Sequence, residues 1–259
     1  MKKILTAFVS LLSLTSIAYA DFARIEVGAG AWFQSPTTSM KYEDSTLDGN
    51  DVSDAGQANT QGYLWLLVKH PLPLVPNMRL EYVNVDSSGM GSGKFKFFPV
   101  ALSDKNKSSL EMTQFDIIPY YNLLDNTSWI TVDVGIDIKI IETLYSIPDP
   151  QILGVSSVTV TGALEETSTD IFPMLYVRGR FEIPATNVGI ESDLKYVTDG
   201  ESDVLDFRAK LDYTLDFIPV IQPAIELGYR VQKMYVITDD DIVADFDFAG
   251  IYVGAMVRF

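Results

Sequence analysis

The side chains of this sequence that could carry chemistry are acidic and basic groups placed at every second position of alternating segments. From Leu205 to Phe217, charged residues and threonine alternate with apolar residues and tyrosine. A spacing of two puts these charges on one face of a β-strand. Opposed charges on such faces can form ion pairs, or they can line a water-filled path that selects solutes by charge. The candidate charge cluster consists of Arg24, Glu26, Asp133, Asp137, Lys139, Glu191, Asp193, Lys195, Asp206, Arg208, Lys210, Asp212, Glu226 and Arg230.

Long β-strands must position these charges. Trp129 to Ile140 and Phe22 to Phe33 alternate in the same way as the segment that ends at Phe217. A helix with such a sequence would scatter charge around all of its faces. Strands of soluble proteins usually have about 5–6 residues, whereas a tilted strand needs roughly 9–11 to cross a bilayer, and these segments reach ten or more. Their length favours membrane-spanning strands over a soluble β-sandwich, in which strands also alternate.

The connectors between the strands differ in length in a regular way. Short connectors are expected at 70–77, 124–128, 184–187 and 218–220. Long ones are expected at 34–60, 87–107, 146–157 and 238–241, with 198–202 a shorter member of the same set. Short turns at one rim and long loops at the other are typical of an outer-membrane barrel.

We therefore predict an all-β fold, a transmembrane antiparallel up-and-down β-barrel of about ten strands. Both termini and the short turns would lie at the periplasmic rim, and the long loops would lie outside the cell. The expected strands are 22–33, 61–69, 78–87, 110–122, 129–144, 160–182, 188–197, 203–217, 221–237 and 243–259.

The last strand ends on an aromatic residue at the C-terminus. Gly254, Val257 and Phe259 have a Gly-x-x-apolar-x-aromatic spacing, which resembles the C-terminal signal that the barrel-assembly machinery recognises. We expect these three residues to act as an assembly signal, and the last strand to pair with the strand at 22–33.

The N-terminus has the features of a secretory signal peptide. Lys2 and Lys3 precede a mostly apolar run at 4–14, and Ala18-Tyr19-Ala20 has the small-x-small form of a cleavage site. We predict a signal peptide at 1–20, export to the bacterial outer membrane, and one barrel domain at 21–259. The sequence contains no cysteine, which excludes a lipoprotein anchor and disulfides.

The formal net charge of −16 disfavours binding to nucleic acid, which needs clustered Lys and Arg. Dense carboxylates in the expected outer loops could hold Ca²⁺ or Mg²⁺ at the lipopolysaccharide surface, but an EF-hand spacing is absent, and solvated charge is the simpler interpretation. We expect outer-membrane lipid and lipopolysaccharide as partners, the barrel-assembly machinery during biogenesis, and a monomer. The carboxylates of the expected outer loops are those of Glu43, Asp44, Asp48, Asp51, Asp54, Asp239, Asp240 and Asp241.

The turn His70–Asn77 has the sequence HPLPLVPN and leads into Met78–Tyr82 and then Asp86-Ser87-Ser88-Gly89. With the Gly254–Phe259 ending, these residues resemble an uncharacterised family of proteobacterial outer-membrane β-barrel proteins that carry an HPxPLxPN turn and an Asp-x-Ser-Gly type motif. The resemblance extends over the mature length, and the turn is its most specific part. It implies a barrel in the outer membrane, and it implies no reaction.

Enzymatic chemistry has little support in the sequence. The one histidine, His70, stands at an expected periplasmic turn, whereas barrel enzymes place a histidine with Asp or Ser partners near the outer rim. We interpret it as a turn-capping or interfacial residue. One histidine and no cysteine leave a zinc site unsupported, and we expect no cofactor. No helix follows the glycine run at 89–93, which we interpret as a flexible loop rather than a phosphate-binding loop.

Two details fit a barrel less well. Proline removes a hydrogen-bond donor from a β-ladder, and we expect bulges or strand ends at Pro119, Pro173 and Pro223. In the segment 78–86, Val83 and Val85 share a row with the charged residues Arg79 and Glu81, and we expect a bulge or emergence from the bilayer near Asn84.

Aromatic residues near strand ends are expected at the membrane–water boundary, namely Trp32, Phe33, Tyr63, Trp65, Tyr120, Tyr121, Trp129, Tyr213, Phe217 and Phe259.

The interior of a barrel of about ten strands is narrow, because open diffusion porins have about 16–18 strands. We therefore favour a lumen packed with ion pairs over a water-filled path. The sequence predicts a non-enzymatic protein that is structural or a narrow passive channel for small solutes. A barrel enzyme that acts on lipid or peptide, and a soluble periplasmic sandwich, are the alternatives.

Overall fold

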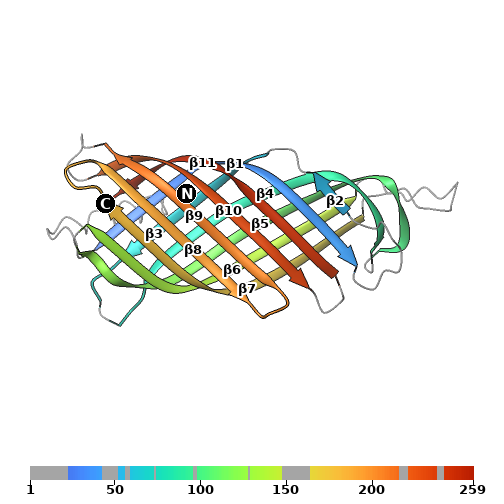
Figure 1. Ribbon diagram of the computed structural model, residues 1–259, viewed down its shortest axis with the longest axis horizontal. Coiled ribbons are helices and arrows are strands. Elements are labelled where there is room, and N and C mark those ends of the chain that lie inside the picture. Colours follow the sequence, from blue (N-terminus) through green and yellow to red (C-terminus); the bar gives the residue numbers. More distant parts are fainter. Residues whose placement is uncertain are drawn as a thin grey trace, which may run out of the picture.

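The computed structural model describes residues 23–42, 52–55, 59–72, 74–95, 98–127, 129–147, 164–215, 221–237 and 242–259. The predicted signal peptide at 1–20 lies outside these residues, as do most of the acidic loop residues, including Asp239 to Asp241. Where the chain is described, ten long strands close into one antiparallel barrel, because β11 pairs with β1 as well as with β10 (Figure 1). The fold is the predicted transmembrane up-and-down β-barrel.

Each barrel strand pairs with the strands that precede and follow it along the chain. The additional short strand β2 (Val52–Ala55) pairs with the distal part of β1 and is not a wall of the barrel. The barrel strands are β1 (Arg24–Tyr42), β3 (Asn59–Lys69), β4 (Asn77–Phe95), β5 (Phe98–Thr127), β6 (Ile130–Ile147), β7 (Leu164–Glu182), β8 (Val188–Thr198), β9 (Asp203–Thr214), β10 (Gln222–Ile237) and β11 (Ile242–Arg258).

The alternating sequence decides which side chains face the lumen. In β9, Asp206, Arg208 and Lys210 are buried, whereas Phe207 and Leu211, which alternate with them, are exposed on the outside. This arrangement inverts that of a soluble protein, because the charges lie inside and an apolar band lies outside. No helix in the described part of the chain is long and apolar enough to span a membrane. The outer band includes Ile136, Leu175, Ile190, Leu194, Phe207, Leu211, Ile225, Leu227, Ile251 and Val253.

The two rims of the barrel differ. The short-turn rim is the end at which β3 joins β4, β5 joins β6, β7 joins β8 and β9 joins β10, and β11 also ends there. The opposite end is called the long-loop rim below. At that end β4 and β5 continue as a paired hairpin that projects beyond the other strands (Figure 1).

This hairpin corrects one prediction. Most described residues of the expected loop at 87–107, including Gly89, Gly91 and Gly93, are paired strand residues of β4 and β5. A flexible loop was the wrong interpretation, because the glycines take part in a cross-strand ladder that satisfies their backbone groups. The ladder accommodates them with one change of register between Gly91 and Gly93.

The three internal prolines occupy positions where a ladder is interrupted or absent. Pro119 pairs with Met78 of β4, but the ladder from β5 to β6 omits it. Pro173 lies in the part of β7 that extends past the described pairing with β8, and Pro223 is the second residue of β10. The missing N–H of proline is therefore tolerated without a bulge.

The row of β4 does not change face. Its register with β5 is constant from Asn77 to Gly91, so the expected bulge near Asn84 was wrong. Val83 and Val85 face the lumen like Arg79 and Glu81, because the interior itself becomes apolar at that level. Asn84 is exposed on the outside, which agrees with emergence from the apolar band.

The seam between the first and last strands depends on small residues. Phe259 donates its N–H to the carbonyl of Ile25 over 2.9 Å, and the last strand pairs with the first as predicted. A Cβ atom on Gly254 would lie 2.1 Å from the Tyr63 hydroxyl and 2.6 Å from the carbonyl oxygen of Ala29. Glycine is thus needed at Gly254 for packing, whatever its part in assembly.

We predict that Gly254→Ala lowers the free energy of unfolding by about 1–3 kcal/mol, because the added methyl group has no room beside backbone atoms. Gly179→Ala is the matched control, since a Cβ there meets nothing within 4 Å. Unfolding of the purified barrel in detergent, followed by heat-modifiable migration on a gel, measures both. Equal stability of the two variants would contradict the packing role of Gly254.

Candidate functional site in the lumen

The candidate site is a network of buried charges inside the barrel. With one exception, the structure places the whole predicted charge cluster in the lumen and buries it. Arg24 lies at the short-turn rim, where its side chain is 35% exposed and pairs with Glu26. Sequence reasoning missed six inward charges, although the alternation around them carried the same signal: Arg79, Glu81, Asp116, Arg178, Arg180 and Arg258.

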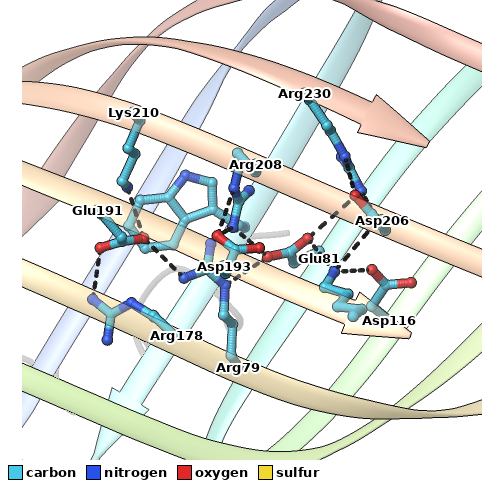
Figure 2. Close-up of polar contacts among 12 residues, drawn as sticks. Arg79, Glu81, Asp116, Arg178, Glu191, Asp193, Asp206, Arg208, Lys210 and Arg230 are labelled. Atoms are coloured by element: carbon cyan, nitrogen blue, oxygen red, sulfur yellow. Dashed lines mark hydrogen bonds and ion pairs between the residues drawn. The ribbon is translucent and has the colours of Figure 1, made fainter. Parts of the chain in front are cut away.

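Glu81 is the hub of the network. One carboxylate oxygen accepts from Arg79 Nε at 2.6 Å and from Arg208 Nη2 at 2.9 Å. The other accepts from Lys195 Nζ at 2.8 Å. Arg208 in turn donates to Asp193 through Nε and Nη2 (Figure 2). One carboxylate therefore joins strands β4, β8 and β9.

Asp206 anchors a second group of ion pairs on the side of the long-loop rim. Arg230 donates to both of its carboxylate oxygens, at 3.0 and 2.6 Å (Figure 2). Lys139 Nζ lies 3.2 Å from Asp206 Oδ2. Lys139 also donates to Asp116, which accepts a second hydrogen bond from Lys195 Nζ at 2.5 Å. Lys195 is thus shared between the two groups and connects them.

A third group lies toward the short-turn rim. Glu191 accepts from Arg178 Nη2 at 2.7 Å and pairs with Lys210 Nζ at 3.4 Å (Figure 2). Asp212 accepts from Arg180 at 2.6 and 3.0 Å and from Arg258 at 2.7 Å. These charge-assisted bonds tie β7, β8, β9 and β11 together from within.

Two contacts span the full width of the lumen. Glu81 of β4 and Arg208 of β9 lie five strands apart in either direction around the ring, on opposite walls. Gln114 of β5 and Gln232 of β10 are also five strands apart, and their amides bond to each other at 3.2 and 2.8 Å. The side chains therefore bridge the barrel at two levels.

Aromatic rings fill the space between the charges. Trp65 lies between Arg79, at 5.0 Å from its centroid, and Lys210, at 4.6 Å, and its Nε1 donates to Glu226. Such cation–π contacts stabilise a desolvated cation. The expected place of four rings at the membrane boundary was wrong, because these rings are buried in the lumen: Trp32, Tyr63, Trp65 and Tyr120. Glycines of the seam leave room for two of them, Gly28 for Trp65 and Gly254 for Tyr63.

An apolar layer follows the network toward the long-loop rim. It consists of inward side chains from eight neighbouring strands of the ring, which are buried except for the partly buried Phe172, Val197 and Val236. The described interior thus has two tiers, one ionic and one apolar, which the sequence analysis did not separate. The layer contains Val83, Val85, Leu110, Met112, Ile141, Phe172, Val197, Val204, Met234, Val236, Phe246 and Phe248.

Asp137 differs from the other buried acids. It is fully buried, and neither carboxylate oxygen has a hydrogen-bond partner in the protein. The nearest cation, Lys195 Nζ, is 3.9 Å away and already serves Glu81 and Asp116. In the described part of the chain ten acidic and nine basic side chains are buried, and Arg24 at the rim pairs with Glu26. Asp137 is the excess carboxyl group in the sense that no cation is hydrogen-bonded to it.

His70 braces the turn between β3 and β4. Its N–H donates to Asn77 Oδ1 at 3.0 Å, and its ring Nδ1 accepts from the N–H of Leu72 at 3.1 Å. Nε2 lies 3.0 Å from the carbonyl oxygen of Pro76, so the proton is on Nε2. Both ring nitrogens serve the turn, which agrees with the turn-capping interpretation.

Among the described residues, no group of three or more His, Cys, Asp or Glu is arranged to hold a metal ion.

Solved structures of similar fold are bacterial outer-membrane proteins. The outer membrane protease OmpT from Escherichia coli aligns with 95% of this chain and 99% of its own, with a TM-score of 0.54 and 9% identity. A major outer membrane protein from Thermus thermophilus aligns with 92% and 99%, with a TM-score of 0.41 and 14% identity. The likeness to OmpT shows the fold alone. No protein-family model and no curated protein matches the chain.

We predict different effects on stability for two neighbouring acids. Asp137→Asn removes the excess carboxylate and is expected to change the free energy of unfolding by less than about 1 kcal/mol, or to raise it. Asp116→Asn leaves Lys139 and Lys195 short of a partner and is expected to cost about 3–5 kcal/mol. Urea unfolding in detergent measures both, and a larger loss for Asp137→Asn would refute the assignment of the excess charge.

Proposed function

We propose that this chain is an integral protein of the bacterial outer membrane, with a structural and non-enzymatic role, whose own side chains close its lumen. The observation that carries the proposal is the contact between Glu81 and Arg208, which joins opposite walls of the barrel. A passage for solutes would have to go through this bridge. Membership of the family with the HPxPLxPN turn is part of the same proposal.

The location in the outer membrane is supported by the outside of the barrel and by its ends. Apolar side chains such as Leu175 and Ile225 are exposed around the wall, which suits acyl chains rather than water. The fold neighbour OmpT is an outer membrane protein by name. With the C-terminal aromatic Phe259 in the periplasm, the short-turn rim is the periplasmic one and the β4–β5 hairpin projects from the cell.

A closed lumen is supported by the energetics of its network. A hydrated ion in the channel would have to displace charge-assisted hydrogen bonds such as Arg230–Asp206, at 2.6 Å, and removing one partner of a buried pair costs about 3–5 kcal/mol. Beyond the network, the apolar layer offers such an ion no polar ligand from Val83, Leu110 or Phe248. The ionic tier therefore opposes permeation because ion pairs must be broken, and the apolar tier opposes it because a dehydrated ion finds no ligand there.

A narrow passive channel for small solutes is the second candidate. It is favoured by buried polar atoms without a hydrogen bond in the protein, including both amide atoms of Gln34 and the hydroxyl of Tyr252. Such atoms usually bind internal water, so parts of the lumen are suited to hydration.

The non-enzymatic role is supported by the state of His70. Its two ring nitrogens are engaged in the turn, at the rim that we assign to the periplasm. A general base must reach a substrate proton, which this histidine cannot do without opening its turn. That OmpT is named a protease says nothing about this chain, since one fold hosts many functions.

We expect the refolded protein to show no sustained unitary conductance in planar bilayers. The double variant Glu81→Ala/Arg208→Ala removes the central bridge of the ionic tier but leaves the apolar layer, and it is expected to give brief, small current steps rather than sustained conductance. The matched control is Lys233→Ala/Asp247→Ala, which removes an exposed ion pair of 2.8 Å on the outer face and should remain silent.

Sustained conductance of the unmodified protein would contradict a closed lumen and favour the narrow passive channel. Release of the native protein from cells by osmotic shock alone would contradict its location in the membrane. Hydrolysis of a peptide or lipid by the purified protein, abolished in His70→Ala, would contradict the non-enzymatic role.

A further inference from the structure

The short-turn rim exposes a cluster of apolar side chains on one side of the barrel. Leu74 in the β3–β4 turn is 91% exposed, and Leu123 near the end of β5 is 65% exposed. Trp129, in the turn between β5 and β6, is 54% exposed. This cluster, called the apolar rim below, consists of Leu72, Leu74, Val75, Tyr121, Leu123 and Trp129.

The structure holds the β3–β4 turn firmly in this position. The three hydrogen bonds of His70 close the turn, and Asn77 Nδ2 donates to Asn122 Oδ1 of β5 at 2.8 Å. The Tyr121 hydroxyl donates to the carbonyl of Leu74 at 3.0 Å, so the turn lies against the outward side of β5. The exposed leucines are presented by a braced turn rather than by a frayed end.

The backbone at two of these residues is unfavourable for the side chain it carries. Leu74 has a φ of 69° and Trp129 has a φ of 67°, in the left-handed region that favours glycine and asparagine. Such strain persists only where something compensates for it, and it concentrates at functional positions. An apolar side chain that is 91% exposed obtains little compensation within the protein.

We propose that the apolar rim inserts into the boundary between headgroups and acyl chains of the phospholipid leaflet at this rim. The rim is continuous with the apolar outer band, because Tyr121 belongs to the same outward row of β5 as Phe115. Apolar side chains with an aromatic ring are typical of the membrane–water interface. This inference rests on the proposed membrane location and adds an anchoring surface to it.

The described turn between β7 and β8 presents smaller side chains than the apolar rim. The turn between β7 and β8, at the same rim, presents Pro184, Ala185 and Thr186, and it has a matching left-handed residue in Ala185, with a φ of 60°. Ala185 adds only a methyl group where Leu74 adds an isobutyl group. The sector from β3 to β6 therefore reaches deeper into the periplasmic leaflet than the sector from β7 to β8.

The absence of cysteine from the sequence allows a direct test. The single variants Leu74→Cys, Ala185→Cys and Ile251→Cys are spin-labelled and refolded into vesicles of phosphatidylethanolamine and phosphatidylglycerol. Collision rates with oxygen, which is enriched in lipid, and with a water-soluble nickel chelate report the depth of each label. Heat-modifiable migration verifies that each labelled barrel is folded.

We expect the label at Leu74 to resemble that at Ile251, which lies on the outer band, with an oxygen-to-nickel collision ratio several-fold above that at Ala185. Equal ratios at Leu74 and Ala185, with Ile251 in lipid, would overturn the proposal and favour a periplasmic protein as the partner of this rim. An aqueous label at Ile251 would instead show that the proposed membrane location fails.

Discussion

The structure depends on one constraint, namely that charges taken into a narrow barrel must neutralise one another. A closed ring of ten strands has no exposed edge, and its inward row faces a space too small for full hydration. An isolated buried charge costs several kcal/mol, so a carboxylate such as Glu81 is stable there only with cations such as Arg208 and Lys195 in contact. The pairing of inward charges thus decides which barrel this sequence can form.

The other features of the interior follow from this pairing. The cations next to Trp65 gain contact with its ring as well as with carboxylates, and the ring fits because Gly28 has no side chain. A Cβ on Gly28 would lie 2.4 Å from the indole nitrogen. The glycines of the seam, the aromatic rings and the ion pairs are therefore one packing unit. The apolar layer then fills the lumen between the charge network and the long-loop rim.

The sequence was sufficient for the fold and for the faces of the strands, because a period of two separates inside from outside without further information. It could not place residues along the barrel axis. Trp32 and Tyr120 stand close to expected strand ends, yet they lie on the inward rows of Glu26 and Asp116, and the strands continue far enough beyond them to bury both rings in the lumen. Val83 follows Glu81 on the same inward row, and only the positions of Leu110 and Met112 across the ladder show that this level is apolar. Partners across the lumen depend on stagger and closure, which no local pattern records.

The bridge between Glu81 and Arg208 also bears on how the barrel forms. These residues are 127 positions apart in the chain, and the seam joins Ile25 to Phe259. Contacts of such long range make loop closure expensive and folding slow. Pairs between neighbouring strands, such as Arg178–Glu191, can form early, but contacts across the lumen, such as Glu81–Arg208, need the closed ring. Partly formed barrels therefore lack the contacts that bridge opposite walls. The contacts across the lumen therefore make ring closure a late and cooperative step, because they stabilise only the complete barrel.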